Sequence, residues 1–217
     1  MAEKKNTMIK DAVILCLITL ILGAVLAGVY AVTKAPIDKA QSDANKAACE
    51  KVVAEGDSVQ DNNTASVSAA KTYLMSHDLA NAEVTSEEDS LIKHVEISEV
   101  HPTANGGTVY LATAKKGYGG DIGFALGVDA NGAITGISIT SQGETAGLGA
   151  NCENEEWQKS FAGKVLPQNA ADNMYNKNES NDSQVQALSG ATVTSRAITN
   201  AVKGILFVAT SMEGGNN

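Results

Sequence analysis

The stretch DIGFALGVDANGAITGISIT, residues 121–140, decides the fold of the main part of the chain. Two apolar runs flank the tetrapeptide DANG at 129–132, and a turn of this composition between such runs is typical of a β-hairpin. Two further alternating segments, HVEISEVHP at 94–102 and GTVYLATAKKGYGG at 107–120, precede the hairpin. Together the four segments predict a meander of antiparallel strands.

Helical patterns flank this meander. The predicted helices cover residues 36–55, 67–79 and 157–161 and a final stretch that begins near Thr194. The final stretch has a broad apolar face, at the spacing of a helix packed on a core. Residues 56–66 and 167–184 are polar, and we expect a loop in the first and a surface loop or short hairpin in the second. The fold class that follows is α+β, with helices packed on an antiparallel sheet.

The chain is acidic, and its charge is unevenly distributed. The formal net charge is −9. The first forty residues hold five lysines against three acidic residues, so the excess of negative charge lies in the rest of the chain. Because a protein that binds nucleic acid needs a basic face to displace counterions from the phosphates, we expect no nucleic-acid partner.

Residues 12–32, AVILCLITLILGAVLAGVYAV, contain no charge and are long enough to cross a bilayer core of about 30 Å. Three lysines precede this run and three follow it up to residue 46, so the positive-inside rule leaves its orientation open. A cleaved signal peptide is the other interpretation, although the apolar run is longer than such peptides typically have. We therefore predict a single membrane span near the N-terminus.

Few residues offer metal or nucleophile chemistry. The three cysteines and three histidines have no spacing typical of a zinc site or an iron–sulfur cluster. Neither a dinucleotide-binding glycine motif nor a Walker sequence occurs in the sequence. Cys16 lies in the apolar run. A disulfide between Cys49 and Cys152 is compatible with the sequence if the part of the chain after that run is exported.

Two glycine-containing stretches remain as candidate sites. GETAGLG, residues 143–149, follows the last predicted strand, and its glycines either permit close approach of a flat ligand or form a flexible turn. QALSGATVTSRAITNAVKGILF, residues 186–207, places a polar turn directly before the last helix. Ser189 or Thr192 is suited to cap that helix, and the same helix N-terminus, with Arg196 one turn further on, is suited to a phosphate.

Both stretches, in this order and behind one apolar N-terminal run, resemble a known family. Residues 117–164, from GYGG to FAGK, and SGATVTS at 189–195 are similar to the FMN-binding domain shared by the G-type component of Rnf complexes (RnfG) and the C-type component of sodium-pumping NADH:quinone reductases. The resemblance covers residues 117–208 and the N-terminal anchor. The pair of motifs is specific, whereas either motif alone is a weak signal.

The resemblance implies a covalent cofactor. In that family a separate flavin transferase esterifies the last threonine of Ser/Thr-Gly-Ala-Thr to the phosphate of FMN, which here makes Thr192 the attachment residue. The residues implied to line the phosphate end are Ser189, Gly190, Ala191 and Thr194. The residues implied to border the isoalloxazine ring are Glu144, Thr145, Leu148 and Gly149, with Lys164 of FAGK as a weaker flavin contact.

The chain departs from the family's pattern at two positions. Ala146 replaces the proline of the usual Glu-Thr-Pro-Gly-Leu-Gly loop, which is expected to loosen that loop. Gln186 stands where the family has an acidic residue three positions before the serine. We expect this change to make recognition by the transferase less efficient.

The function implied by the resemblance is electron transfer. An RnfG-type protein is a membrane-anchored relay in an Rnf-type ion-translocating ferredoxin:NAD oxidoreductase complex rather than a self-contained enzyme, and its partners include iron–sulfur and flavin subunits. By the same resemblance the chain passes once through the cell (inner) membrane, with its soluble domain on the extracytoplasmic side. The C-type component of the quinone reductase and a non-redox scaffold or solute-binding domain are the other interpretations.

The expected organisation has five parts. They are a short cytoplasmic N-terminus at 1–11, the transmembrane helix at 12–33, a helical connector at 34–85, the FMN-binding domain at 86–212 and a tail at 213–217. The functional body is therefore the part that follows the membrane helix.

Overall fold

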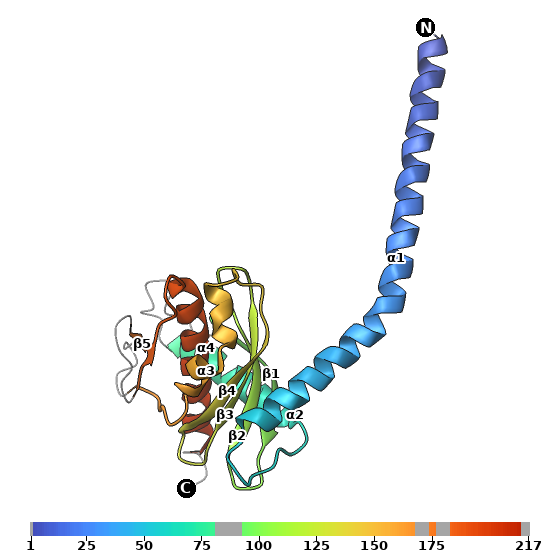
Figure 1. Cartoon of the computed structure of the whole chain (residues 1–217). Coiled ribbons are helices and arrows are strands. Elements are labelled where there is room, and N and C mark those ends of the chain that lie inside the picture. The colour runs from blue at the N-terminus through green and yellow to red at the C-terminus, as the bar shows by residue number, and fades with distance from the viewer. Residues whose placement is uncertain (1, 81–92, 168–173, 177–182, 214–217) are drawn as a thin grey trace. The chain divides into compact units, whose positions relative to one another are not determined.

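The computed structural model describes residues 2–80, 93–167, 174–176 and 183–213 (Figure 1). The chain divides into two compact units, residues 1–44 and 45–217. One continuous helix, α1 (Ala2–Val52), forms the first unit and ends in the second.

Helix α1 carries the predicted membrane span. From Lys10 onward it is long and apolar enough to cross a membrane. Its large apolar side chains are exposed, including Leu20 at 68 % and Leu26 at 73 %. Such a row of exposed side chains is favourable only in apolar surroundings, which is consistent with a membrane anchor. The helix predicted for residues 36–55 is the continuation of α1, which ends at Val52.

A four-stranded sheet forms the centre of the second unit. The strands are β1 (Val95–Pro102), β2 (Thr108–Ala114), β3 (Ile122–Val128) and β4 (Ile134–Ser141). They are antiparallel neighbours in chain order, so the predicted meander is confirmed. The DANG turn closes the β3–β4 hairpin, where the Asp129 carboxylate accepts hydrogen bonds from the N–H groups of Asn131 and Ala133.

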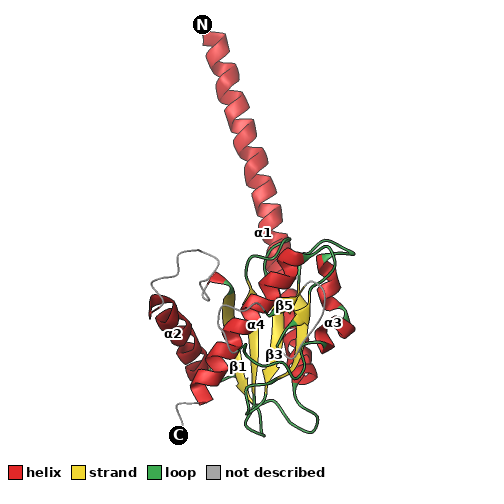
Figure 2. Cartoon of the chain, turned by 90° about the vertical axis from the view of Figure 1, so that its left-hand side faces the viewer, coloured by secondary structure: helices red, strands yellow, loops and turns green. Residues whose placement is uncertain are grey.

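Two helices cover one face of the sheet. Helix α4 (Thr192–Glu213) contacts β1, β2 and β3, and α2 (Thr64–Ala80) contacts β1 and α4 (Figure 2). Ile198, Ile205 and Phe124 are fully buried between α4 and the sheet. Burying an Ile or Phe side chain completely stabilises the fold by about 1.5–3 kcal/mol, so this contact is a main source of stability. Helix α4 begins two residues before the predicted Thr194, because the Ala191 carbonyl already accepts from the Ser195 N–H.

The end of α1 covers the other face of the sheet. Ala48, Cys49 and Val52 pack against side chains of β2 and β3. Thr135 of β4 donates its hydroxyl hydrogen to the Val52 carbonyl, which the end of the helix leaves without an intrahelical partner. The neighbouring strand position, Gly127, has no side chain and lets the Val52 backbone approach the sheet.

Short elements complete the second unit. A 3₁₀ turn, η2 (Gly149–Glu153), is followed by α3 (Glu155–Lys159), which starts two residues before the predicted short helix because Asn154 caps it by accepting from the Glu156 N–H. The pair β5 (Tyr175–Asn176) and β6 (Val185–Gln186) is parallel, so these two strands do not form a hairpin. The rest of the predicted loop, 168–173 and 177–182, lies outside the described residues.

The three cysteines are free. Cys49 packs on the sheet face that α1 covers, whereas Cys152 is buried in the core on the face that α4 covers. Because the sheet lies between the two sulfur atoms, the disulfide that the sequence left open does not form.

Replacing Gly127 by alanine should destabilise the second unit, because the new Cβ would lie inside contact distance of the Val52 carbonyl oxygen and of Thr135 Oγ1. Overpacking of this kind costs about 1–3 kcal/mol, and we expect the free energy of unfolding to fall by that amount. Guanidinium unfolding of the full chain in detergent, followed by the fluorescence of the single tryptophan, Trp157, measures the change. Gly136→Ala is the matched control, since its Cβ would meet Val52 only at 3.4 Å, and an equal loss in both variants would contradict this account.

Cys49 and Cys152 should react slowly with thiol reagents in the folded chain. Burial, with a smaller effect of nearby carboxylates, raises the pKa of Cys49 to about 11 and the pKa of Cys152 to about 12. Both groups are therefore protonated at about pH 8, and only the thiolate is nucleophilic. Maleimide labelling of a Cys16→Ser chain, measured by intact mass, should be slow on the folded protein and fast in denaturant. Fast labelling before unfolding would show that these thiols are accessible and thus contradict their burial.

Candidate functional site

Three segments meet at one edge of the sheet. They are the β2–β3 loop at 115–121, the segment after β4 at 142–149 and the first turn of α4. In an antiparallel sheet the end of β2, the start of β3 and the end of β4 lie at the same edge, so the two loops are neighbours by topology. A hydrogen bond from Thr194 to Glu144 adds the first turn of α4, so both glycine-containing stretches singled out in the sequence belong to one place in the fold.

The Glu144 carboxylate joins the three segments. One oxygen, Oε1, accepts a hydrogen bond from the Gly119 N–H at 2.9 Å, and the other, Oε2, accepts from the Thr194 hydroxyl at 2.6 Å. Glu144 is 9 % exposed and Thr194 is 1 % exposed. Buried carboxylates are stable only when they are hydrogen-bonded, and these two donors satisfy that requirement.

Glycines allow this close approach. A Cβ on Gly149 would lie inside contact distance of Glu144 Oε2 and 2.6 Å from Thr194 Oγ1, and a Cβ on Gly119 would collide with the Gly143 carbonyl. By contrast, a Cβ on Gly120 or Gly147 would meet no atom within 4 Å. The inner sides of the loops are thus packed together, and their outer sides are open.

The SGAT turn is held by Ser195, which is not among the site residues predicted from the sequence. Ser195 Oγ accepts from the Leu188 N–H at 2.9 Å and donates to the Ala191 carbonyl at 3.0 Å. In the part of the chain that the structure describes, the Ser189 and Thr192 side chains make no hydrogen bond, so the expected capping by either residue is not observed. Thr192 is half-buried at the first position of α4, with its hydroxyl uncommitted.

Gly190 makes the turn possible. Its φ of 71° lies in the left-handed region that favours glycine. Leu148 Cδ2 would lie only 3.0 Å from a Cβ at this position, so the leucine packs directly over the glycine backbone. The contact brings the GETAGLG loop and the SGAT turn together, as the hypothesis of a shared site requires.

Exposed apolar side chains mark the open side of the site. Tyr118, Leu148 and Val193 are 74 %, 44 % and 49 % exposed, and each lies on a different one of the three segments. Tyr118 is next to Gly119, and Val193 is next to Thr194. Exposed side chains of this kind offer apolar area to a flat ligand or a partner. Tyr118 and Val193 are not among the site residues predicted from the sequence, although an aromatic residue between glycines in a loop is a detectable signal.

The remaining predicted site residues are placed differently. The Thr145 side chain is exposed, and its carbonyl accepts from the N–H groups of Leu148 and Ala150, which closes the loop. Ser189 is exposed on the SGAT turn. The Lys164 backbone pairs with Ile134 at the start of β4, the opposite end of that strand from Glu144. The structure thus does not bring Lys164 together with the other residues.

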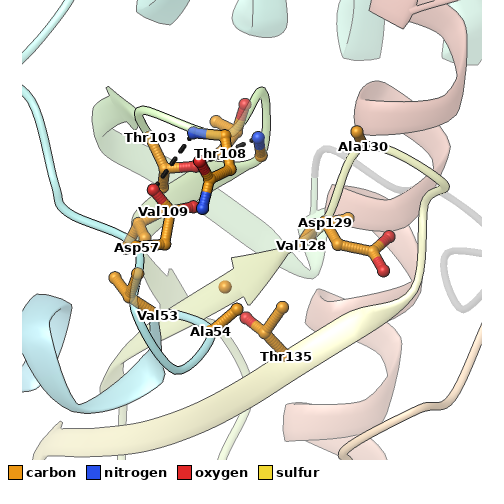
Figure 3. Close-up of a pocket in the computed structure, with 13 residues that line it drawn as sticks. Val53, Ala54, Asp57, Thr103, Thr108, Val109, Val128, Asp129, Ala130 and Thr135 are labelled. Atoms are coloured by element: carbon orange, nitrogen blue, oxygen red, sulfur yellow. Dashed lines mark hydrogen bonds between the residues drawn. The ribbon is translucent and has the colours of Figure 1, made fainter.

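A small pocket lies at the opposite edge of the sheet. Its volume is about 80 Å³, and its lining includes Asp57, Thr103, Asp129 and Thr135 (Figure 3). Sites for cofactor-sized ligands typically measure about 300–1,000 Å³, so this pocket is too small for a flavin. Among the described residues no group of three or more His, Cys, Asp or Glu side chains is arranged to hold a metal ion.

Comparison with known proteins agrees with the two motifs. The FMN-binding domain family matches residues 117–206, and the RnfG N-terminal region matches residues 1–52. The chain is 32 % identical over 160 residues to the RnfG-type protein of the proton-translocating ferredoxin:NAD(+) oxidoreductase complex of Clostridium ljungdahlii, over 68 % of this chain and 84 % of that protein.

One further relative and one solved structure come from quinone reductases. The NqrC-type protein of the Na(+)-translocating NADH-quinone reductase of Haemophilus ducreyi is 45 % identical over 83 residues, which are 36 % of this chain and 32 % of that protein. The crystal structure of NqrC from Shewanella oneidensis aligns with a TM-score of 0.45 and 20 % identity, over 54 % of this chain and 62 % of that one.

Replacing Gly149 by alanine should disrupt the site. The added Cβ would collide with the Glu144 carboxylate and push it away from Thr194, which leaves a buried acceptor poorly satisfied. We expect a loss of about 1–3 kcal/mol in the free energy of unfolding and faster hydrogen exchange of the Gly119 amide. Gly136→Ala, on the same sheet but away from this edge, is the control and should leave that amide protected. Unchanged Gly119 exchange in Gly149→Ala would be evidence against the packing described here.

Proposed function

The chain belongs to the RnfG family of Rnf-type ion-translocating oxidoreductase complexes, and we propose that it is the membrane-anchored flavin subunit of such a complex, with FMN covalently attached to Thr192. The observation that carries the proposal is the convergence of GETAGLG and SGAT on one site, with an uncommitted Thr192 hydroxyl at the start of α4. When bound, FMN accepts electrons from one partner and passes them to another.

The residues present fit a flavin phosphate. The first N–H groups of α4 lack intrahelical acceptors, and the helix dipole adds positive potential at this end, which favours an anion next to Thr192. Ser189, Gly190 and Ala191 form the turn that leads into these N–H groups. The open side of the loops, with the exposed Leu148, offers apolar area to the ring.

The attachment reaction is a phosphoryl-type transfer to a hydroxyl. The Thr192 oxygen forms a bond to the phosphorus of a flavin nucleotide donor, the hydroxyl proton is lost, and the donor's leaving group departs from phosphorus. The product is a phosphoester, and the chain gains the mass of FMN less one water. A separate transferase supplies the donor and the base, and the chain's own contribution is to present the hydroxyl.

The same proposal covers location and partners. Helix α1 anchors the chain in the cell membrane, and the second unit lies on the extracytoplasmic side, where it meets iron–sulfur and flavin subunits of the complex. The match of residues 1–52 to the RnfG N-terminal region supports the Rnf assignment. The 45 % identity to an NqrC-type protein of a quinone reductase is the observation that favours the second candidate, although it covers 32 % of that protein. Co-purification with ferredoxin-linked iron–sulfur subunits or with quinone reductase subunits separates the two.

Intact-mass measurement after denaturation tests the attachment. The full chain produced with its transferase should be heavier by one FMN less one water, and Thr192→Ala should lack this increment because it has no hydroxyl at that position. Ser189→Ala, which removes the neighbouring hydroxyl on the same turn, should keep the increment. An unmodified wild-type chain from the native source would contradict covalent attachment of FMN, and it would favour a non-redox scaffold or solute-binding role.

A further inference from the structure

We propose that Glu144 is a positioning residue for flavin attachment: it holds the first turn of α4 so that the Thr192 hydroxyl faces outward before any phosphate arrives. This inference rests on the proposed attachment of FMN to Thr192. It assigns to Glu144 an action through Thr194 and Gly119, and not through contact with the ring.

The contacts of the carboxylate carry the inference. Each oxygen already accepts a hydrogen bond from the protein, Oε1 from the Gly119 N–H and Oε2 from the Thr194 hydroxyl. The Glu144 backbone is fixed as well, because its N–H donates to Gln142 Oε1 at 2.6 Å. Charge-assisted hydrogen bonds of this kind are short and directional, so the side chain is held in one orientation.

Helix geometry transmits this constraint to Thr192. Residues two positions apart on an α-helix point about 200° apart around the axis. Holding the Thr194 side chain inward against Glu144 therefore turns the Thr192 side chain outward. The observed burial agrees, since Thr194 is 1 % exposed and Thr192 is half-buried. A hydroxyl that is held in one orientation reacts faster than a hydroxyl that samples several orientations.

The other segments reinforce the same turn. Gly149 lies against both Glu144 and Thr194, and Leu148 packs over Gly190. The loop after β4 therefore contacts the SGAT turn at Gly190 and the helix that follows it at Thr194. Gly119 brings the β2–β3 loop into the same arrangement. These contacts act together with the Ser195 hydrogen bonds to Leu188 and Ala191, and the contribution from the loop after β4 passes through Glu144 and its near neighbours.

Substitution of the partner hydroxyl tests the inference. Thr194→Val removes the hydrogen-bond donor but keeps the shape, and we expect the rate of flavin attachment by the transferase to fall about tenfold or more. Thr194→Ser keeps the donor and should restore a rate near that of the wild type. Thr199→Val is the matched control, because Thr199 is equally buried in α4 but donates to the Ser195 carbonyl. Attachment is measured as the growth of the mass increment on full chain that circular dichroism shows to be folded.

A double-mutant comparison separates positioning from general destabilisation. Glu144→Met removes both acceptor oxygens at a similar side-chain size and should also slow attachment. The Glu144→Met/Thr194→Val chain should be no slower than the slower single variant, because both changes remove the same hydrogen bond between the two residues. Glu144→Met also provides the test if Thr194→Val does not fold. In the chain without flavin, the Gly119 amide should exchange faster in Glu144→Met than in Thr199→Val, because its acceptor is lost.

Three results would overturn the inference. They are a wild-type attachment rate in Thr194→Val, an equal loss of rate in Thr199→Val, and fully additive effects in the double variant. These results differ from a failure of the proposed function itself, in which the wild-type chain gains no FMN or Thr192→Ala still gains it.

Discussion

The two central strands are apolar on both faces, and the rest of the second unit is arranged around that constraint. Tyr110 and Phe124 point to the face that α4 covers, while Leu111 and Ala125 point to the face that the end of α1 covers. A strand of this kind is stable only when both faces are protected from water. The helix that carries the apolar span therefore also supplies part of the core, and the chain needs no separate element for the second face.

This arrangement leaves one edge of the sheet for the candidate site. Helix α4 starts at that edge, so its uncompensated N–H groups lie near the loops that follow β2 and β4. Loops alone would be poorly fixed there, and the buried Glu144 carboxylate ties them to the helix. The fold thus separates two tasks: the apolar faces supply stability, and the hydrogen bonds of Glu144 and Ser195 fix the geometry of the site.

Local signals predicted most of the fold, and long-range contacts explain what they missed. The DANG hairpin and the amphipathic last helix depend on neighbouring residues, so the sequence shows them directly. The role of Glu144 depends on Gly119 and Thr194, which are 25 and 50 residues away, and spacing along the chain does not reveal such a contact. The placement of Lys164 beside the start of β4 follows from the return of the chain after α3, which no local pattern indicates.

The structure shows the surroundings of Ala146 and Gln186, the two residues that depart from the family pattern. Ala146 lacks the stiffness of proline, but hydrogen bonds from the N–H groups of Leu148 and Ala150 to the Thr145 carbonyl close the loop without it. The Gln186 side chain is exposed, and its carbonyl accepts from the indole N–H of Trp157 at 2.8 Å. Any residue supplies that carbonyl, so this hydrogen bond does not depend on the side chain at position 186.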